Sequence, residues 1–238
     1  MPKEKQIHLV MQDMLFLTWA VQPEAVREMI DARLELDTKI DSEGRVIAFM
    51  SAVCFRVAEV RSSVLPLPRL NFEQVNCRAY VKAGEIPAVF FLDMKVNSRM
   101  ITTLTNFLGV PIRYEDIDIA TAPGDNGSLS YAVQSAGLRA RVVIGEPEDG
   151  NAPAGNMEPG FVTDRLVGYA GKGDNMFKIE IDQPGLNTIG GRVESVEGQR
   201  LEELRLLTAD QSSQPYSALY VRETVFGTDM PTRNSGLV

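Results

Sequence analysis

The sequence predicts an α+β domain that is mainly β and is built on an antiparallel sheet or barrel. Runs of β-branched and aromatic residues recur at roughly 8–12-residue spacing, which is typical of such folds. Turn residues rich in Gly, Asn and Asp separate the runs. One long run, at 46–60, is apolar or small on both of its faces, as in strands of closed barrels or of sheets that helices cover.

Eight strands are expected, each bounded by turn or helix signals. They lie at 15–21, 46–60, 74–81, 88–95, 128–135, 138–145, 177–181 and 216–226. Hairpin turns are expected at 83–85, 125–127, 136–137 and 173–175, each of which contains a glycine that permits a tight turn.

Helices are expected between some of these strands. Pro23 suits the first turn of a helix over 24–31. A second helix begins after Asn97 or Ser98, carries its apolar residues on one face and ends at Gly109. Shorter helices are expected at 161–166 and 198–207.

Residues 1–227 are expected to form one domain. The segment 146–160 is rich in Gly, Pro, Asn and Glu and is interpreted as a loop rather than a boundary, because strands lie on both sides of it. Residues 228–238 are expected to form a loose tail. The sequence does not decide whether the chain forms a homo-oligomer.

The charge balance argues against several classes of partner. The 238 residues include 24 Lys and Arg and 32 Asp and Glu, a net charge of -8. Such an acidic chain lacks the basic surface of nucleic-acid-binding proteins and is repelled by anionic membranes. No apolar stretch has the roughly 18 residues of a membrane span, and residues 1–6 do not resemble a secretory signal. Cys54 and Cys77 are interpreted as buried thiols, so the expected location is the cytoplasm.

Polar side chains on two predicted strands form a candidate ligand site. Asn76, Arg78 and Tyr80 share one face of strand 74–81, and Arg56 lies on the small-residue face of strand 46–60. That small-residue face is expected to border an interior cavity rather than a filled core. One interpretation leaves the polar face in solvent. The other places Arg56, Asn76 and Arg78 around one pocket, where two guanidinium groups bind a carboxylate or phosphate.

Few residues of the sequence are candidates for metal binding or for acid–base catalysis. The single histidine, His8, has no metal-ligand spacing and no catalytic partner nearby in the sequence, so we expect neither a metal nor another cofactor. Glu73 and Asp93 are candidate general bases. Asp93 follows the apolar run 89–92, where an acid is paired, caps a helix or is functional; these alternatives stay open.

Several segments between about residue 10 and residue 225 resemble segments of the YqjF-like family of conserved proteins and follow one another in the same order as in that family. They are Leu15-Phe16-Leu17-Thr18-Trp19, Pro23, Leu34-Glu35-Leu36-Asp37, Phe55-Arg56-Val57, Leu65-Pro66-Leu67-Pro68, Asn76-Cys77-Arg78-Ala79-Tyr80-Val81, Phe90-Phe91-Leu92-Asp93, Gly109-Val110-Pro111 and Phe161-Val162-Thr163-Asp164-Arg165. That family is similar to a branch of the acetoacetate decarboxylase-like superfamily. The resemblance therefore implies a closed antiparallel β-barrel with an internal cavity and a few flanking helices.

The resemblance does not extend to the decarboxylase mechanism. In the decarboxylase, a helical stretch opened by Leu-Asp ends in a proline followed by two lysines, one of which forms a Schiff base while its neighbour lowers the pKa. Here the stretch opens at Leu92-Asp93 and closes at Pro111, but Ile112 and Arg113 follow. Isoleucine cannot form an imine, so Schiff-base decarboxylation is not expected.

The sequence thus predicts a barrel that binds a small carboxylate or carbonyl compound in its interior. Arg56 and Arg78 are expected to hold the charge of the ligand, and Arg113 to lie near its reacting or carbonyl end. Asn76 and Tyr80 are expected to supply hydrogen bonds.

Other assignments stay open. Arg165 is a further family-like binding position, and its alternative is an ion pair with Asp164 or Asp93. The protein could instead be a lyase, isomerase or hydrolase without a Schiff base, in which Glu73 or Asp93 is the base. A third hypothesis is a structural or interaction scaffold without a ligand.

Overall fold

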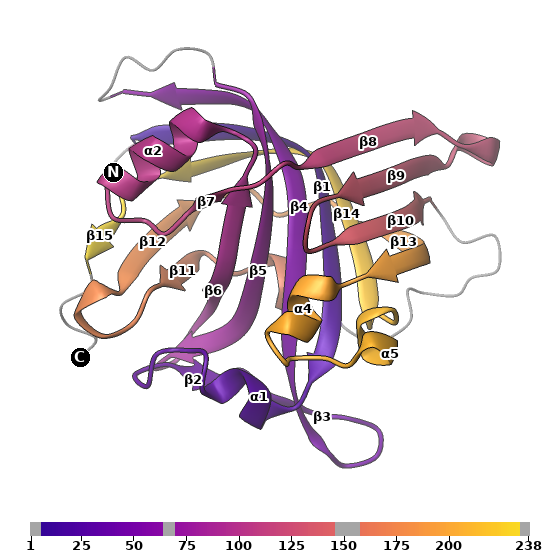
Figure 1. Ribbon diagram of the computed structural model, residues 1–238, viewed down its shortest axis with the longest axis horizontal. Helices are drawn as coiled ribbons and strands as arrows, with labels where there is room; N and C mark the ends of the chain where they lie inside the picture. Colours follow the sequence, from indigo (N-terminus) through magenta and orange to yellow (C-terminus); the bar gives the residue numbers. More distant parts are fainter. Residues whose placement is uncertain (1–5, 64–69, 146–157, 234–238) are drawn as a thin grey trace.

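The computed structural model describes residues 6–63, 70–145 and 158–233 (Figure 1). The Leu65-Pro66-Leu67-Pro68 segment and most of the expected loop, 146–157, lie outside the described residues. The described chain is mainly β, with five short α-helices around the strands.

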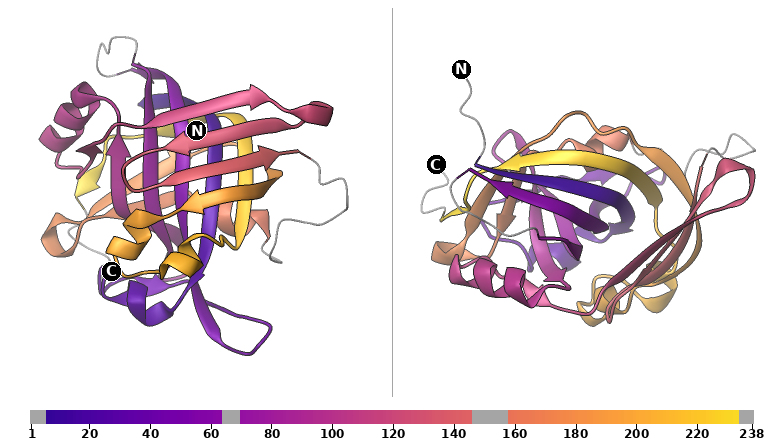
Figure 2. Two further views of the ribbon diagram at one scale, coloured as in Figure 1. Left: turned by 45° about the vertical axis from the view of Figure 1, so that its right-hand side comes forward. Right: turned by 90° about the horizontal axis from the view of Figure 1, so that it is seen from above.

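Seven strands pair in an order that returns to its starting point. The order is β12 (Phe177–Asp182), β11 (Val167–Ala170), β6 (Ile86–Val96), β5 (Phe72–Ala83), β4 (Val46–Ser62), β1 (Ile7–Val21) and β14 (Ser217–Thr228). β14 then pairs again with β12, through Ile181 opposite Thr228 and Asp182 opposite Gly227. Neighbours are antiparallel except β6 and β11, which are parallel. The right-hand view of Figure 2 shows these strands following one another around a ring.

Four further strands extend the sheet from β14. They are β13 (Ile189–Glu197), β10 (Arg139–Ile144), β9 (Leu129–Gln134) and β8 (Asp118–Pro123), paired in this order. In Figures 1 and 2 they lie across the outside of β4, β1 and β14. We refer to these four strands as the outer sheet.

The remaining elements are short. They are β2 (Glu35–Leu36), β3 (Lys39–Ile40), β7 (Arg113–Tyr114) and β15 (Thr232–Arg233), with α1 (Pro23–Arg27), α2 (Arg99–Phe107), α3 (Pro159–Thr163), α4 (Gln199–Glu203) and α5 (Ala209–Ser212). Within the described ranges, no helix combines the length and apolar character needed to cross a bilayer.

The helix signals read from the sequence are confirmed at the start of the first two helices. Pro23 begins α1, and the side chain of Ser98 accepts a hydrogen bond from the backbone of Ile101 at the start of α2. Gly109 follows α2 with a φ of 80°, where a side chain would be strained. α1 ends at Arg27, so the helix expected over 24–31 is shorter than predicted. The helices expected at 161–166 and 198–207 are also shorter.

All eight expected strands are present. The two-residue strands β2, β3, β7 and β15 were not predicted, and neither were three longer ones, β8, β11 and β13. Each of these three lacks a strong apolar run; β13, for example, begins Ile189-Gly190-Gly191-Arg192 and is largely exposed or half-buried. Its pairing with β10 and β14 holds it in place. Such strands form because neighbours supply hydrogen bonds, a contribution that is absent from local sequence.

Part of the segment expected to be a loose tail, 228–238, pairs with the sheet. Thr228 is the last residue of β14, and Thr232 and Arg233 pair with Lys178 and Phe177 of β12. Thr228, Thr232 and Arg233 are therefore part of the sheet, and 234–238 lie outside the described residues.

β4 is buried on both faces, as predicted, but the two faces have the opposite roles to those expected. The small-residue face, with Ala48, Ala52 and Cys54, packs beneath the outer sheet in one hydrophobic cluster. The larger residues Val53 and Phe55 face the other side, in a second cluster. The predicted cavity face is therefore a filled core, because a second layer of sheet covers it.

Both cysteines are buried and free, which confirms their interpretation as buried thiols. Burial raises the pKa of Cys77 to about 12 and raises that of Cys54 as well.

Asp31 links the segment after α1 to the turn between β11 and β12. Its buried carboxylate accepts two hydrogen bonds from the Arg33 guanidinium, at 2.8 and 3.0 Å, and others from the backbone nitrogens of Arg33 and Gly173. The Arg33 hydrogen bond holds the pKa of Asp31 well below its ordinary value of 3.8.

Replacing Asp31 by Asn is expected to lower the free energy of unfolding by about 2 kcal/mol at pH 7, the usual worth of hydrogen bonds to a charged group. Because the folded state binds the proton less readily than the unfolded chain, the contribution is present above the unfolded pKa and is lost as the pH falls below it. Urea denaturation at pH 7 and pH 3 measures the effect. A difference between Asp31→Asn and wild type that is as large at pH 3 as at pH 7 would contradict this assignment.

Candidate functional site

A pocket of about 270 Å³ lies on the inner side of the ring strands. It is lined by β1, β4, β5, β6 and β12, by α2 and the segment after it, and by residues 226–231. An engineered apolar cavity of about 150 Å³ holds benzene, so this pocket has room for a small organic molecule. Its polar lining residues are Gln74, Asn76, Arg78, Thr105, Thr163, Arg165, Gln183, Thr228 and Asp229; the others are apolar.

One face of β5 supplies three of these polar residues. Gln74, Asn76 and Arg78 alternate along the strand, so their side chains point to the same side. All three line the pocket, and Asn76 is only 7% exposed. Gln74 Nε2 donates to Asn76 Oδ1 at 2.7 Å. The structure therefore places these three side chains on one face, as expected, and that face lines the pocket.

One nitrogen and the plane of the Arg78 guanidinium contact neighbouring residues, and the other two nitrogens have no acceptor among the described residues. Its Nη2 donates to the carbonyl oxygen of Val162 at 2.7 Å, and the guanidinium lies 5.2 Å from the centre of the Phe16 ring. Among the described residues, neither Nε nor Nη1 of Arg78 has a hydrogen-bond acceptor, and no carboxylate forms an ion pair with it.

Tyr80 lies behind Arg78 rather than in the pocket lining. Its hydroxyl is 3.5 Å from Arg78 Nη2 and 2.6 Å from Ser51 Oγ, which is 2.7 Å from Thr18 Oγ1. All three hydroxyl-bearing residues are fully buried. This chain of hydroxyl groups supports the guanidinium, so the structure gives Tyr80 an indirect place beside the pocket instead of the direct contact expected.

Arg165 does line the pocket, but its charge is already neutralised. Its side chain is 4% exposed, and its Nη1 lies 2.7 Å from Asp37 Oδ2, while its Nε donates to the Phe161 carbonyl. The expected alternative partners were Asp164 or Asp93; the structure pairs Arg165 with Asp37 instead. Asp37 lies after β2, and its backbone nitrogen bonds to the Tyr80 carbonyl, a long-range contact that the sequence does not reveal.

Arg56 does not share the pocket with Asn76 and Arg78. The register of β4 and β5 places Arg56 opposite Glu73 and Val53 opposite Asn76. Opposed residues point to the same side, and in β4 residues 53 and 56 point to opposite sides. Arg56 therefore faces the outer sheet, and the prediction that it joins Arg78 around one ligand is corrected.

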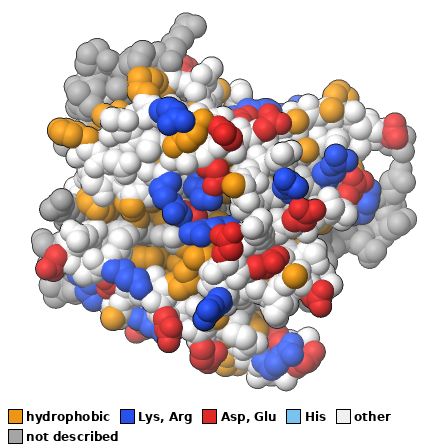
Figure 3. Space-filling view, in the orientation of Figure 1, with side chains coloured by type: hydrophobic (Ala, Val, Ile, Leu, Met, Phe, Trp, Pro, Cys, Tyr) orange, Lys and Arg blue, Asp and Glu red, His pale blue; other side chains and the backbone are white. Residues whose placement is uncertain are grey.

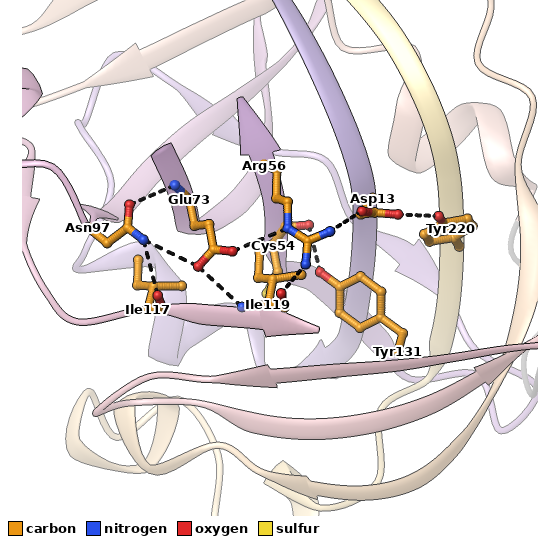
Figure 4. Close-up of polar contacts among 9 residues, drawn as sticks. All are labelled: Asp13, Cys54, Arg56, Glu73, Asn97, Ile117, Ile119, Tyr131 and Tyr220. Carbon is orange, nitrogen blue, oxygen red and sulfur yellow. Dashed lines mark hydrogen bonds and ion pairs between the residues drawn. The ribbon is translucent and has the colours of Figure 1, made fainter. Parts of the chain in front are cut away.

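The contacts of Arg56 bridge the ring and the outer sheet (Figure 4). Its guanidinium donates to Asp13, to the Ile119 carbonyl of β8 and, at 3.2 Å, to Glu73 Oε1. Asp13 also accepts from the Tyr220 hydroxyl at 2.6 Å.

Glu73 is part of the same network and not of the pocket. It accepts from the backbone nitrogen of Ile119 at 3.2 Å and from Asn97 Nδ2 at 3.3 Å (Figure 4). Burial raises the pKa of Glu73 above its ordinary value of 4.5, against the lowering effect of Arg56. The structure therefore places this expected general base in a structural contact.

Asp93 likewise lies outside the pocket, at the centre of a group of cations. It shares the face of Cys77, its partner in β5. Its carboxylate is 2.5 Å from Arg113 Nη2 and 2.9 Å from Arg200 Nε, with Lys95 Nζ at 3.9 Å. Figure 3 shows basic and acidic side chains interspersed on this side of the molecule. Of the alternatives for Asp93, the structure supports the paired residue.

Ile112 and Arg113 point in opposite directions. Ile112 lines the pocket and is 8% exposed, whereas the Arg113 side chain is 58% exposed and reaches Asp93 outside the pocket. Arg113 is therefore not near the ligand end expected for it. Among the described residues that line the pocket, none is a lysine.

Thr163, Gln183 and Asp229 also line the pocket and were not identified from the sequence. Gln183 Nε2 donates to the Thr163 carbonyl at 2.8 Å. Thr163 lies in the family-like Phe-Val-Thr-Asp-Arg segment, which was a usable signal. Gln183 and Asp229 directly follow β12 and β14, and nothing in their local sequence marks them.

Comparison with known sequences relates the chain to a family and to a curated protein. A family model described as "Uncharacterized conserved protein" (DUF2071) matches residues 9–224. The uncharacterized protein YqjF of Bacillus subtilis (strain 168) is 29% identical over 108 residues, a match that spans 44% of this chain and 43% of that protein.

Solved structures show the fold. Acetoacetate decarboxylase from Legionella pneumophila is 9% identical with a TM-score of 0.61, over 98% of this chain and 92% of that one. An acetoacetate decarboxylase-like enzyme from Sphingomonas wittichii RW1 is 13% identical with a TM-score of 0.60, over 97% and 94%. The enduracididine biosynthesis enzyme MppR, complexed with pyruvate, is 12% identical with a TM-score of 0.58, over 98% and 91%. The mainly β fold with few helices is thus acetoacetate decarboxylase-like, as the sequence resemblance implied.

Proposed function

The chain belongs to the DUF2071 family of uncharacterized conserved proteins and has an acetoacetate decarboxylase-like fold, and on this premise we propose that it binds a small carboxylate or carbonyl compound in the pocket beside Arg78. In this proposal the seven ring strands form a closed barrel, and the pocket is its internal cavity. The ligand is held by non-covalent contacts to Arg78 and Asn76.

The observation that carries the proposal is the state of Arg78. A guanidinium whose Nε is buried without an acceptor, in a mostly apolar pocket, is stabilised when a ligand supplies an acceptor. A carboxylate accepts two parallel hydrogen bonds from such a group. Asn76 lies two residues away on the same face, and its amide nitrogen has no acceptor among the described residues. A concave apolar site with a few polar groups is the usual form of a small-molecule site.

A neighbour in fold supports the ligand class. The MppR structure holds pyruvate, a small compound that carries both a carboxylate and a carbonyl group. Because the two sequences are only 12% identical, the comparison with MppR supports a class of ligand and does not specify a particular compound.

The residues around the pocket favour binding without a Schiff base. Ile112 occupies the pocket wall and the lining residues of the described chain include no lysine. Glu73 and Asp93, the candidate bases of the lyase, isomerase or hydrolase hypothesis, are held in ion pairs outside the pocket. No observation therefore favours that hypothesis over binding. The two free, buried thiols support a reducing compartment, and we include a cytoplasmic location in the proposal.

A thermal-shift screen tests the proposal. Oxo acids, short carboxylates, aldehydes and phosphates are added to wild type, to Arg78→Met and to Arg113→Met, which removes the same charge outside the pocket. A ligand at about 100 times its dissociation constant adds about 2.7 kcal/mol, which for a chain of this size raises the Tm by roughly 5–10 °C. We expect carboxylates or oxo acids to stabilise wild type and Arg113→Met but not Arg78→Met.

If no compound of these classes shifts the Tm of wild type, binding in this pocket is contradicted. The scaffold hypothesis then becomes the better account. Equal shifts in wild type and Arg78→Met would instead mean that the ligand binds elsewhere.

A further inference from the structure

The charged groups of the pocket lie at its two ends. Arg78 packs on Phe16, which pairs with Leu219 in β14, whereas Asp229 follows Thr228, which pairs with Ile7. Phe16 is nine positions beyond Ile7 along β1, a separation of roughly 30 Å for an extended chain. Asp229 therefore lies far from Arg78 and does not neutralise it. Because Arg165 is paired with Asp37, one positive charge remains for the ligand at the Arg78 end.

The wall between these ends is continuously apolar. Along β1 the residues that line the pocket are Ile7, Leu9, Met11, Met14 and Phe16. The first three have odd numbers and the last two have even numbers, yet all five point to the same side of the sheet. The reason is that the register shifts between Gln12 and Leu15, around Asp13, whose φ is 51°. The lining is therefore a long apolar stripe that begins at the guanidinium.

The elements that face β1 across the pocket are also apolar. α2 contributes Ile101, Leu104 and Leu108, and the segment after it contributes Ile112. At position 112 this wall presents a branched alkyl group. A two- or three-carbon oxo acid bound at Arg78 would leave most of this apolar surface uncovered.

The volume limits the size of a ligand that lies along the Arg78 end of the stripe. If benzene, with six non-hydrogen atoms, is held in about 150 Å³, a pocket of about 270 Å³ takes roughly ten. An unbranched carboxylate of about eight carbons has that size and an extended shape.

We propose that the natural ligand is an amphiphilic monocarboxylate of medium chain length, with its carboxylate on Arg78 and its alkyl body along the apolar stripe of β1. The inference rests on the proposed function, which requires only that a carboxylate or carbonyl compound binds in this pocket. It adds the apolar body, its length and the single negative charge.

Isothermal titration calorimetry with a homologous series tests the inference. The probes are pyruvate, butanoate, hexanoate, octanoate, dodecanoate and octan-1-ol, each titrated into wild type, Arg78→Met, Arg78→Lys and the control Arg113→Met. Affinity is expected to rise about fourfold per methylene from butanoate to octanoate and to stop rising by dodecanoate. Octanoate is expected to bind wild type at least about tenfold more tightly than octan-1-ol, because hydrogen bonds to a charged group are strong.

The variants separate the head group from the body. In Arg78→Met the preference for octanoate over octan-1-ol is expected to vanish while the dependence of affinity on chain length remains. Arg78→Lys, which keeps the charge, is expected to retain part of the preference, and Arg113→Met all of it. If Arg78→Met does not fold, the chain-length series on wild type and the Arg78→Lys result still decide the question.

The outcomes distinguish this inference from the proposed function. Pyruvate or butanoate binding as tightly as octanoate overturns the amphiphilic ligand and leaves the proposed function standing. Equal binding of octanoate and octan-1-ol to wild type overturns the role of Arg78 as the carboxylate site. If none of the probes nor any compound of the thermal-shift screen binds, the inference and the proposed function fall together.

Discussion

Replacing Arg56 by methionine is expected to lower the free energy of unfolding by about 2–3 kcal/mol, because its ion pairs are part-buried and lie between exposed and fully buried pairs in cost. The substitution leaves Asp13 and Glu73, each with a side chain 17% exposed, without their shared cation. It also removes the hydrogen bond to the Ile119 carbonyl, which attaches β8 of the outer sheet to the ring. Urea denaturation at pH 7 measures the change.

The pH dependence of this loss follows from Glu73. Its folded-state pKa is raised, so the folded protein holds the proton more readily than the unfolded chain, and the cost of the buried charge is relieved as the pH falls. Without Arg56 that cost is larger at neutral pH. The difference between wild type and Arg56→Met is therefore expected to shrink from pH 7 to pH 5, and Arg56→Met/Glu73→Gln to recover part of the stability.

Arg61→Met is the matched control, because Arg61 pairs with Glu59 at the surface and is 67% exposed. Such a change is expected to stay within about 0.5 kcal/mol. An Arg56→Met variant no less stable than this control would show that the network does not attach the outer sheet. Since Arg56 lies outside the pocket, folded Arg56→Met is expected to bind carboxylates as wild type does.

Replacing Asp93 by asparagine is expected to cost about 2–3 kcal/mol of unfolding free energy, because a buried carboxylate is lost from among three cations. Asp93 is 5% exposed on its side chain, and Arg113, Arg200 and Lys95 surround it. Asparagine has nearly the same shape, so the loss reports charge and not packing. Denaturant unfolding gives the stability, and calorimetry with octanoate gives the affinity.

The affinity of the folded Asp93→Asn variant is expected to match that of wild type. This pairing of results separates a structural carboxylate from a general base, which would leave stability largely unchanged while abolishing turnover. A stable Asp93→Asn protein that had lost an activity present in wild type would favour the enzyme hypothesis and contradict the structural assignment.

Much of the local architecture was available from the sequence, because its physical causes are local. Strand alternation has a period of two, so the shared face of Asn76 and Arg78 followed from residue spacing alone. Pro23 and Gly109 marked helix ends through their own backbone preferences. The isoleucine at position 112 excludes an imine there whatever the fold, because its side chain lacks a nitrogen.

The partners of the charged residues could not be read in the same way. Alternation states which residues of β4 share a face, but both faces are apolar, so it does not state which one meets the pocket. Arg56 meets Glu73 and Ile119 only because the β4–β5 register is fixed and β8 packs across the ring. Arg165 meets Asp37 through a similar long-range contact.

The sequence by itself therefore determined the strands with strong apolar runs, the polar face of β5 and the absence of lysine at position 112. Only the tertiary structure decided that Arg78 has no carboxylate partner among the described residues, while Arg165 is paired with Asp37 at the pocket wall and Arg56 and Arg113 form ion pairs outside the pocket. The physical reason is that side-chain alternation and backbone preference act over a few residues, whereas the charge balance of a pocket depends on strand register and on which sheet covers which face.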